Sequence, residues 1–202
     1  MDRQDWDSRY AARDLVWSAT PNQFVAAEVA DLAPGRALDV ACGEGRNALW
    51  LASQGWAVTA VDFSAEGIAT GRRRAEEAGV EIDWVVADVV EWEADADAFA
   101  LVVVAYLQLG AEAMRAALGH SARALAVGGT LVAVGHDRSN LDGGYGGPQD
   151  PSVLWTPEAI VAGITAVRPD LETVRAEVVA RRVATDSGEQ VALDTLVRAT
   201  RP

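Results

Sequence analysis

Residues 38–52 read LDVACGEGRNALWLA, and this stretch decides the fold of the chain. An apolar run, 36–40, leads into a corner of small residues, 41–45, and a helical pattern starts near Asn47. The order predicts a strand, a tight turn and a helix. Because glycine carries no Cβ, the backbone of the corner can approach a ligand closely, and the start of the helix offers unpaired N–H groups. We therefore expect negative or hydrogen-bond-accepting atoms of a ligand at this corner.

Acidic residues lie in or after three successive predicted strands. Asp39 lies inside the first strand, where a buried parallel strand is expected to be apolar. The second strand, 57–61, ends on Asp62, about 20 residues after the corner, the position from which an acid binds ribose hydroxyls. The third strand, 82–87, ends on Asp88. These acids are therefore expected on the ligand side of a parallel sheet.

The same corner also fits the dinucleotide-binding fingerprint G-x-G-x-x-G/A, with Gly43, Gly45 and Ala48. An NAD(P)-dependent oxidoreductase on a related fold is therefore an alternative. That alternative predicts glycine nearer the end of the strand and no acid at position 39, so Asp39 counts against it.

The composition predicts a single domain, 1–202. A chain of 202 residues with 50% hydrophobic residues is long enough to bury a continuous core. It has no run of roughly 18 uncharged apolar residues, and the charged start MDRQDWDSRY lacks the apolar segment of a signal peptide. Cys42 is the single cysteine, so an internal disulfide is excluded. We expect a soluble, cytoplasmic protein that does not bind a membrane.

The charge of the chain argues against a nucleic-acid partner. The formal net charge is -13, and all 17 basic residues are arginines. Nucleic-acid binding needs basic patches that attract phosphates, and the run 72–74 lies beside glutamates, which indicates a solvated helix face. The two histidines, His120 and His136, and one cysteine are too few for a zinc site, so no metal is expected.

On both sides of the corner, predicted helices alternate with strands. Capping residues set the predicted helix limits: Thr20-Pro21 to Pro34-Gly35, Ser64 to Gly79, Glu112 to Leu125 with Gly128-Gly129 as its end, and Thr156-Pro157 to Val167. The further predicted strands are 99–105 and 130–135, followed by an antiparallel hairpin of 171–184 and 189–200 joined at 186–188.

Three segments together resemble the class I S-adenosylmethionine-dependent methyltransferases: DVACGEG (39–45), VDFS (61–64) and VADV (86–89). The resemblance covers nearly the whole chain, and CGEGRNALWLA with the preceding Trp/Tyr-containing segment is most similar to the tellurite-resistance and thiopurine methyltransferase branch, which acts on small molecules. Ala41 is a departure, because the family often has glycine there. The resemblance implies an α/β fold, a doubly wound, mostly parallel seven-stranded Rossmann-like sheet with a C-terminal antiparallel hairpin.

The resemblance also implies S-adenosyl-L-methionine as cofactor and S-adenosyl-L-homocysteine as product. We expect a monomer or homodimer. The resemblance places Gly43 and Gly45 along the methionine part of the cofactor, Asp39 near the ammonium, Asp62 on both ribose hydroxyls and Asp88 on the adenine amino group. Arg46 is expected either to pair with the cofactor carboxylate or to form a surface salt bridge. The other predicted cofactor-binding residues are Ala41, Phe63, Val89, Tyr106, Trp6 and Tyr10.

The acceptor is expected to be a small, apolar or heterocyclic molecule, methylated on oxygen, sulfur or nitrogen. Methyl transfer from a sulfonium needs alignment and, for a protonated acceptor, a base. The predicted catalytic residues are His136, a base at the end of the fifth strand, and Tyr106, at the end of the fourth. A hydrogen bond from His136 to the following loop, without chemistry, is the alternative. The sequence Ala105-Tyr106-Leu107-Gln108 lacks an Asn/Asp-Pro-Pro-aromatic element, which argues against adenine methylation of DNA.

Two segments are predicted to flank the acceptor. The N-terminal part, 1–20, is interpreted as an aromatic flap, with a helix packed on the domain as the alternative, and 136–156 is a long loop on the substrate side. The aromatic residues expected either to wall the acceptor pocket or only to pack are Tyr10, Trp17, Tyr145 and Trp155. A non-catalytic protein that senses the adenosyl cofactor is a further alternative.

Overall fold

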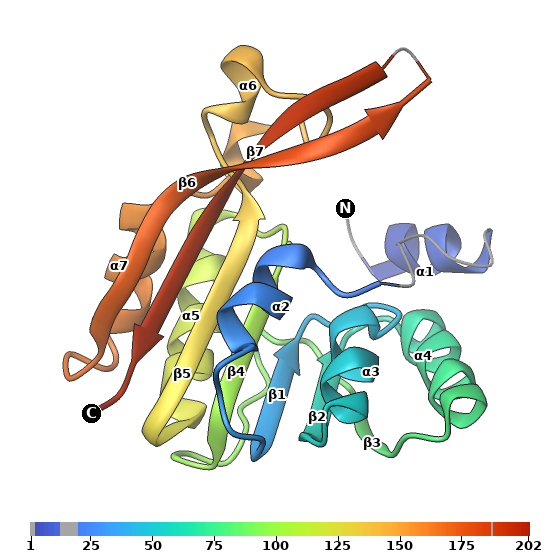
Figure 1. The fold of residues 1–202 in the computed structure, drawn as a ribbon, viewed down its shortest axis with the longest axis vertical. Helices are drawn as coiled ribbons and strands as arrows, with labels where there is room; N and C mark the ends of the chain where they lie inside the picture. The colour runs from blue at the N-terminus through green and yellow to red at the C-terminus, as the bar shows by residue number, and fades with distance from the viewer. Residues whose placement is uncertain (1–2, 13–19, 187) are drawn as a thin grey trace.

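A computed structural model describes residues 3–12, 20–186 and 188–202. The described chain forms one seven-stranded sheet in the order β3-β2-β1-β4-β5-β7-β6 (Figure 1). The strands are β1 (Arg36–Val40), β2 (Ala57–Asp62), β3 (Ile82–Val86), β4 (Phe99–Ala105), β5 (Leu125–His136), β6 (Glu172–Thr185) and β7 (Gly188–Thr200). The helices are α1 (Arg3–Ala11), α2 (Gln23–Val29), α3 (Arg46–Ser53), α4 (Ala65–Ala78), α5 (Ala111–Ala124), α6 (Asn140–Gly143) and α7 (Pro157–Thr165), with a short 3₁₀ turn at Pro151–Val153.

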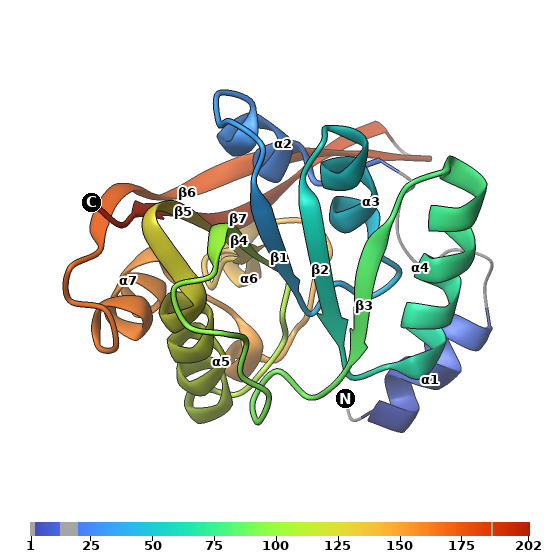
Figure 2. The same cartoon turned by 90° about the horizontal axis from the view of Figure 1, so that it is seen from below.

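Strands β1 to β5 are parallel, and β7 is antiparallel to both β5 and β6. Helices cover both faces of the sheet (Figure 2). Alternate residues of β4 feed the two cores: Val102 and Val104 pack with α5 and α7, whereas Leu101 and Val103 pack with α2 and α3. This two-sided burial explains the nearly unbroken branched apolar run of β4. The predicted fold class, with its C-terminal antiparallel hairpin, is confirmed.

Several predicted helix limits are confirmed by capping contacts. The Ser64 hydroxyl accepts from the backbone N–H of Gly67, and Gly79 ends α4 in the left-handed conformation. The first predicted helix was placed too early, because Asn22 and not Thr20 is its cap. The Oδ1 atom of Asn22 accepts from the N–H groups of Phe24 and Val25, at 2.9 and 3.1 Å.

Two predicted helix ends are wrong. Helix α2 ends at Val29, well before Pro34-Gly35. Gly128-Gly129 does not end α5, since the chain enters β5 directly at Leu125, which pairs with Phe99 of β4. The register then shifts before Leu101 pairs with Thr130, so the two glycines lie in an irregular part of the strand. Strand pairing, a tertiary contact, sets this boundary. No helix in the described ranges has both the length and the apolar character to span a membrane.

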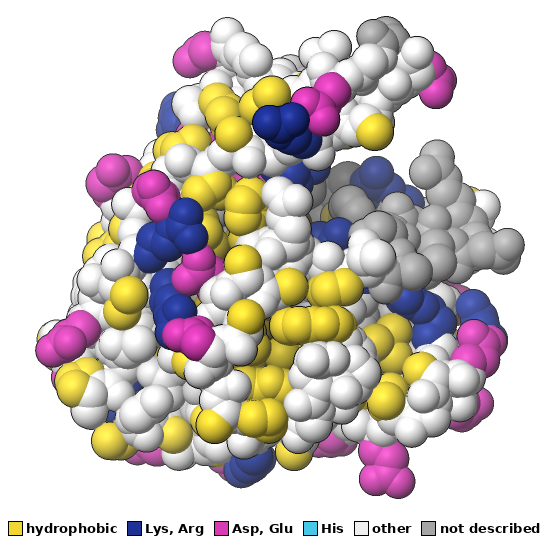
Figure 3. Space-filling model, viewed as in Figure 1, with side chains coloured by type: hydrophobic (Ala, Val, Ile, Leu, Met, Phe, Trp, Pro, Cys, Tyr) yellow, Lys and Arg dark blue, Asp and Glu magenta, His cyan; other side chains and the backbone are white. Residues whose placement is uncertain are grey.

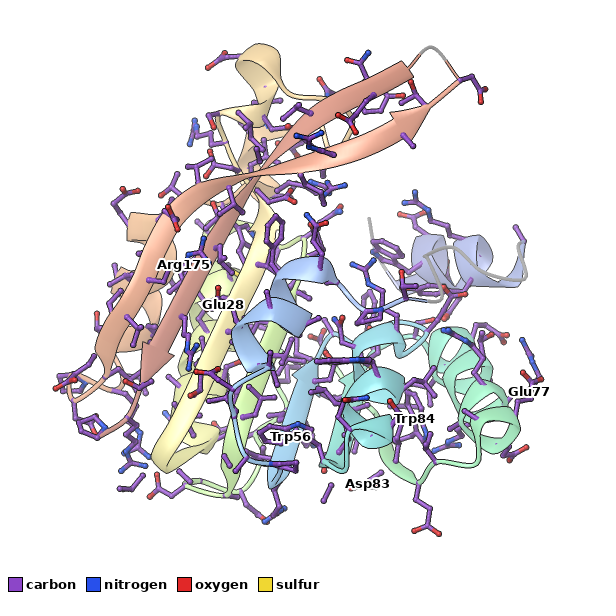
Figure 4. The ribbon with its side chains drawn as sticks, viewed as in Figure 1. Glu28, Trp56, Glu77, Asp83, Trp84 and Arg175 are labelled. Carbon is purple, nitrogen blue, oxygen red and sulfur yellow. The ribbon has the colours of Figure 1, made fainter. Side chains whose placement is uncertain are left out.

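Trp84 of β3 explains two glycines that are far apart in the sequence (Figure 4). A Cβ on Gly45, whose φ is +74°, would lie 2.4 Å from Cη2 of Trp84. A Cβ on Gly71, inside α4, would lie 2.5 Å from the same atom. The indole therefore fills the space between the corner and α4, and both glycines are needed for its fit.

Asp39 is an acid buried inside β1, only 1% exposed. Its Oδ2 atom accepts from the backbone N–H of Ala48 at 3.0 Å, which ties β1 to the first turn of α3. Oδ1 has no hydrogen-bond partner among the described residues. Burial raises the pKa of Asp39 from 3.8 to about 7, although the Ala48 N–H and the charge of Arg46 oppose the shift.

Replacing Gly71 by alanine should destabilise the protein. In an open helix this change stabilises by about 0.5–1 kcal/mol, but here the added methyl meets Trp84, so we expect a loss of about 1–3 kcal/mol in the free energy of unfolding. Urea denaturation measures the loss. In a Trp84→Leu background the same Gly71→Ala change should be neutral or stabilising. A Gly71→Ala protein more stable than the original would contradict the packing role of Trp84.

The buried acid predicts a specific pH dependence. The folded protein holds the Asp39 proton to higher pH than the unfolded chain, so ionisation costs stability as pH rises from about 4 to about 7. Relative to an Asp39→Asn variant, the free energy of unfolding of the original protein should fall by up to about 4 kcal/mol over this range. Denaturation of both proteins at a series of pH values measures the difference. A difference that is constant with pH would show that Asp39 titrates normally.

Candidate functional site

A first cavity lies at the carboxyl ends of the parallel strands, where the strand order reverses between β1 and β4. Ligands of open α/β sheets bind at such switch points. All predicted cofactor-binding residues except Asp39 and Gly45 line it. The lining residues are Trp6, Tyr10, Ala41, Cys42, Gly43, Arg46, Asn47, Asp62, Phe63, Asp88, Val89, Ala105, Tyr106, Leu107, Gln108 and Leu109.

The carboxylate of Asp62 links the corner 41–45 to the start of α4. Oδ2 accepts from the backbone N–H of Gly43 at 2.8 Å, and Oδ1 accepts from the N–H of Ser64 at 2.9 Å. Burial raises the pKa of Asp62, while these two N–H groups oppose the shift. Ala41 and Gly43 both have φ of +56°, so the corner holds a left-handed alanine where the related family often has glycine.

The remaining acids of the three strand ends lie at different depths. Asp88 lines the first cavity, and its Oδ1 atom accepts from the N–H of Val90 at 2.9 Å. Asp39 lies within β1 and contacts the start of α3 instead of lining the cavity. Gly45 also lies outside the lining, and its place opposite Trp84 gives it a packing role.

Helix α1 closes one side of the first cavity. Trp6 and Tyr10 stack with ring centroids 5.6 Å apart, as expected for one helix face, and both line the cavity. The hydroxyl of Ser64 donates to the carboxylate of Asp7, which ties α1 to the start of α4. Tyr10 is 6% exposed, so this part of the predicted flap is packed on the domain. Trp17 lies outside the described residues.

A second cavity adjoins the first, and Arg46, Tyr106 and Gln108 line both. The other residues of the second cavity are Arg9, Asn22, His136, Tyr145, Gly146, Gly147, Pro148, Arg181 and Val183. They come from α1, the segment before α2, the end of β5, the loop that follows it, and β6. The two predicted catalytic residues therefore meet here.

Asp194 of β7 organises the boundary between the cavities. Its Oδ2 atom accepts from the Tyr106 hydroxyl at 2.7 Å and from Nε of Arg181 at 2.6 Å. Nδ1 of His136 lies 3.4 Å from Oδ1. Burial raises the pKa of the fully buried Asp194, but the contacts with His136, Arg181 and Tyr106 outweigh burial and lower it. Asp194 is therefore ionised at neutral pH.

Tyr106, which donates to this carboxylate, has a left-handed backbone conformation with φ of +55°. Burial, and then the charge of Asp194, raise the pKa of its phenol, so the phenol stays protonated and donates to Asp194. Its ring lies 4.8 Å from the His136 ring, and the guanidinium groups of Arg46 and Arg181 lie 5.6 and 5.7 Å from its centroid. Burial lowers the pKa of Arg46.

Sequence reasoning missed Asp194 and Arg181. The missed signal was an acid inside an apolar strand, Leu193-Asp194-Thr195-Leu196, the same signal that singled out Asp39. Of the predicted pocket aromatics, Tyr145 lines the second cavity. Trp155 lines neither: it is 3% exposed, and its Nε1 donates to the backbone oxygen of Leu107 at 3.0 Å, so the packing alternative holds for it.

Comparison with known proteins gives a partial sequence match. Residues 37–129 match the model of a methyltransferase domain family. The chain is also 37% identical over 102 residues to demethylmenaquinone methyltransferase of Thermus thermophilus. That alignment covers 50% of this chain and 46% of the relative, so the chain matches less than half of the relative's length.

Solved structures match over most of the chain. The N-methyltransferase NodS from Bradyrhizobium japonicum WM9, in complex with S-adenosyl-L-homocysteine, has a TM-score of 0.72 at 21% identity, covering 99% of this chain and 98% of its own. TehB from Haemophilus influenzae has a TM-score of 0.70 at 17% identity, covering 90% and 63%. Identities this low show a shared fold, and the tellurite-resistance and thiopurine branch stays a prediction. Residues 37–129 thus match the methyltransferase domain family, and the described chain shares the Rossmann-like methyltransferase fold of NodS.

Proposed function

We propose that this protein transfers a methyl group from S-adenosylmethionine to a small-molecule acceptor. The observation that carries the proposal is the junction of the two cavities at Tyr106. The first cavity is lined by the glycine corner and two acids, and the second contains the only histidine that lines either cavity in the described chain. A cofactor in the first cavity can therefore present its methyl group to an acceptor in the second.

The residues of the first cavity fit the proposed cofactor. The carboxylates of Asp62 and Asp88 each accept hydrogen bonds from backbone N–H groups. Each carboxylate has further acceptor sites, which suit ribose hydroxyls at Asp62 and the adenine amino group at Asp88. Asp39 lies outside the lining of this cavity, so its expected place near the ammonium of the methionine part stays a prediction. Arg46 lines both cavities and is suited to the methionine carboxylate.

Bound S-adenosylmethionine would supply a methyl group on a positively charged sulfur. This sulfur is an activated leaving group, because it departs as a neutral thioether with the C–S electron pair. The chain then has to align the acceptor and remove its proton if it has one. His136 is the base in this proposal. Since Nδ1 faces Asp194 at 3.4 Å, Nε2 lies on the opposite side of the ring, away from that carboxylate. The carboxylate of Asp194 beside Nδ1 favours this orientation of the imidazole.

Cofactor binding tests the first cavity. S-adenosylhomocysteine should raise the melting temperature and NAD should not, because only a ligand of the native state stabilises it. Asp88→Ala should weaken S-adenosylhomocysteine binding by about 10- to 100-fold in calorimetry, through loss of a charged hydrogen-bond acceptor. Asp83→Ala is the matched control, since exposed Asp83 lies at the other end of β3 (Figure 4). Stabilisation by NAD alone would favour the oxidoreductase.

Turnover tests His136. A screen of phenols, thiols and heterocycles, read by S-adenosylhomocysteine release, identifies an acceptor. His136→Gln should then lower kcat by about 100-fold or more. His120→Gln is the control and should leave kcat unchanged, because His120 lines neither of the two cavities. An unchanged kcat would leave His136 with only a structural role. Cofactor binding without turnover of any acceptor would favour a protein that senses the cofactor.

A further inference from the structure

The second cavity is basic although the chain as a whole is acidic. The formal net charge is -13, yet among the described residues that line this cavity there are three arginines and one histidine, and no aspartate or glutamate. Figure 3 shows arginine side chains in the hollow below the projecting hairpin. The first cavity differs, because two acids, Asp62 and Asp88, line it together with Arg46. The second cavity therefore suits a negatively charged ligand group better than the first cavity does.

The three arginines come from separate elements. Arg9 is an exposed residue of α1, Arg46 starts α3, and Arg181 lies on β6. Alternation along β6 turns Arg181 toward the cavity and its neighbour Arg182 outward, where Arg182 is 79% exposed and pairs with Glu189 at 2.9 Å. The fold thus selects one of two adjacent arginines for the cavity.

Asp194 contacts the arginine on β6, and its carboxylate is shared by Arg181, Tyr106 and His136. Among the described residues, no aspartate or glutamate lines the cavity itself. Arg46 also lines the first cavity and is suited to the cofactor, whereas Arg9 and Arg181 line only the second. A bound anion in the second cavity would lower the electrostatic cost of grouping these cations.

We propose that the methyl acceptor is itself an acid, a small molecule whose carboxylate or phosphate group binds Arg181 and Arg9 in the second cavity. Arginine is well suited to these groups because its planar fork donates two parallel hydrogen bonds. The anion anchors the acceptor at the β6 and α1 side, and its nucleophilic atom then lies toward Tyr106 and His136. An acidic acceptor differs from the apolar or heterocyclic acceptor expected from the sequence. The inference rests on the proposed function for the methyl transfer, but the anion site can be tested by itself.

The test uses matched acidic and neutral probes with the protein saturated by S-adenosylhomocysteine. Calorimetry at millimolar concentration compares 4-hydroxybenzoate and phenyl phosphate with 4-hydroxybenzamide and phenol. We expect at least one acid to bind about tenfold or more tightly than its neutral partner, as for an added charge-assisted hydrogen bond. Equal or tighter binding of the neutral probes, or no binding of either acid, would overturn the proposal.

Variants locate the anion. Arg181→Gln should weaken the acidic probe about tenfold or more without a matching effect on the neutral probe. Arg9→Gln, on an exposed position, should weaken it in the same direction, and this variant answers the question if Arg181→Gln fails to fold. Arg182→Gln is the control and should bind like the original protein. Loss of affinity in Arg182→Gln equal to that in the other two would point to general surface charge and reject the site.

S-adenosylhomocysteine titration of each protein separates the two proposals. If the cofactor product binds and the acids do not, the acidic acceptor fails and the methyltransferase proposal stands. If the cofactor product itself does not bind, the proposed function fails first.

Discussion

The structure depends on the hydrogen bond by which the Asp62 carboxylate fixes the corner 41–45. The carboxylate at the end of β2 accepts from the N–H of Gly43 after β1 and from the N–H of Ser64 before α4. The corner after β1 and the turn from β2 into α4 are thereby fixed to one side chain. Because the corner also contains a left-handed alanine and glycine, the hydrogen bonds stabilise a backbone shape that few residues adopt. Ala41, Gly43 and Asp62 of this arrangement line the first cavity.

Asp194 plays the corresponding part at the second cavity. It lies on β7, next to β5 and β6 in the sheet, and contacts Tyr106 of the segment after β4, His136 of β5 and Arg181 of β6. A fully buried carboxylate is stable there because hydrogen bonds and a guanidinium replace its lost hydration. The antiparallel hairpin, which is peripheral to the parallel sheet, thus supplies Asp194 and Arg181 at the second cavity. Both cavities meet at Tyr106, held by this carboxylate.

The contrast between the cavities follows from the topology. The parallel strands end in Asp62 and Asp88, so the first cavity is lined by acids. The second cavity collects arginines from α1, α3 and β6, which approach the sheet edge from different directions. A single acidic chain can therefore present two adjoining cavities of different charge, which share Arg46, Tyr106 and Gln108.

The sequence by itself determined the local features. They are the corner 41–45, the acids after the strands, the start of a helix at Ser64 and its end at Gly79, and the succession of strands along the chain. These follow from backbone geometry and from hydrogen bonds between near neighbours, which a short stretch of sequence contains. Only the tertiary structure decided which glycines serve Trp84, where α5 ends against β4, and that Trp155 is buried while Arg181 faces a cavity. It also placed Asp194 beside Tyr106, 88 residues away. These features depend on contacts between distant segments and on which face of a strand is covered, and local preference does not encode them.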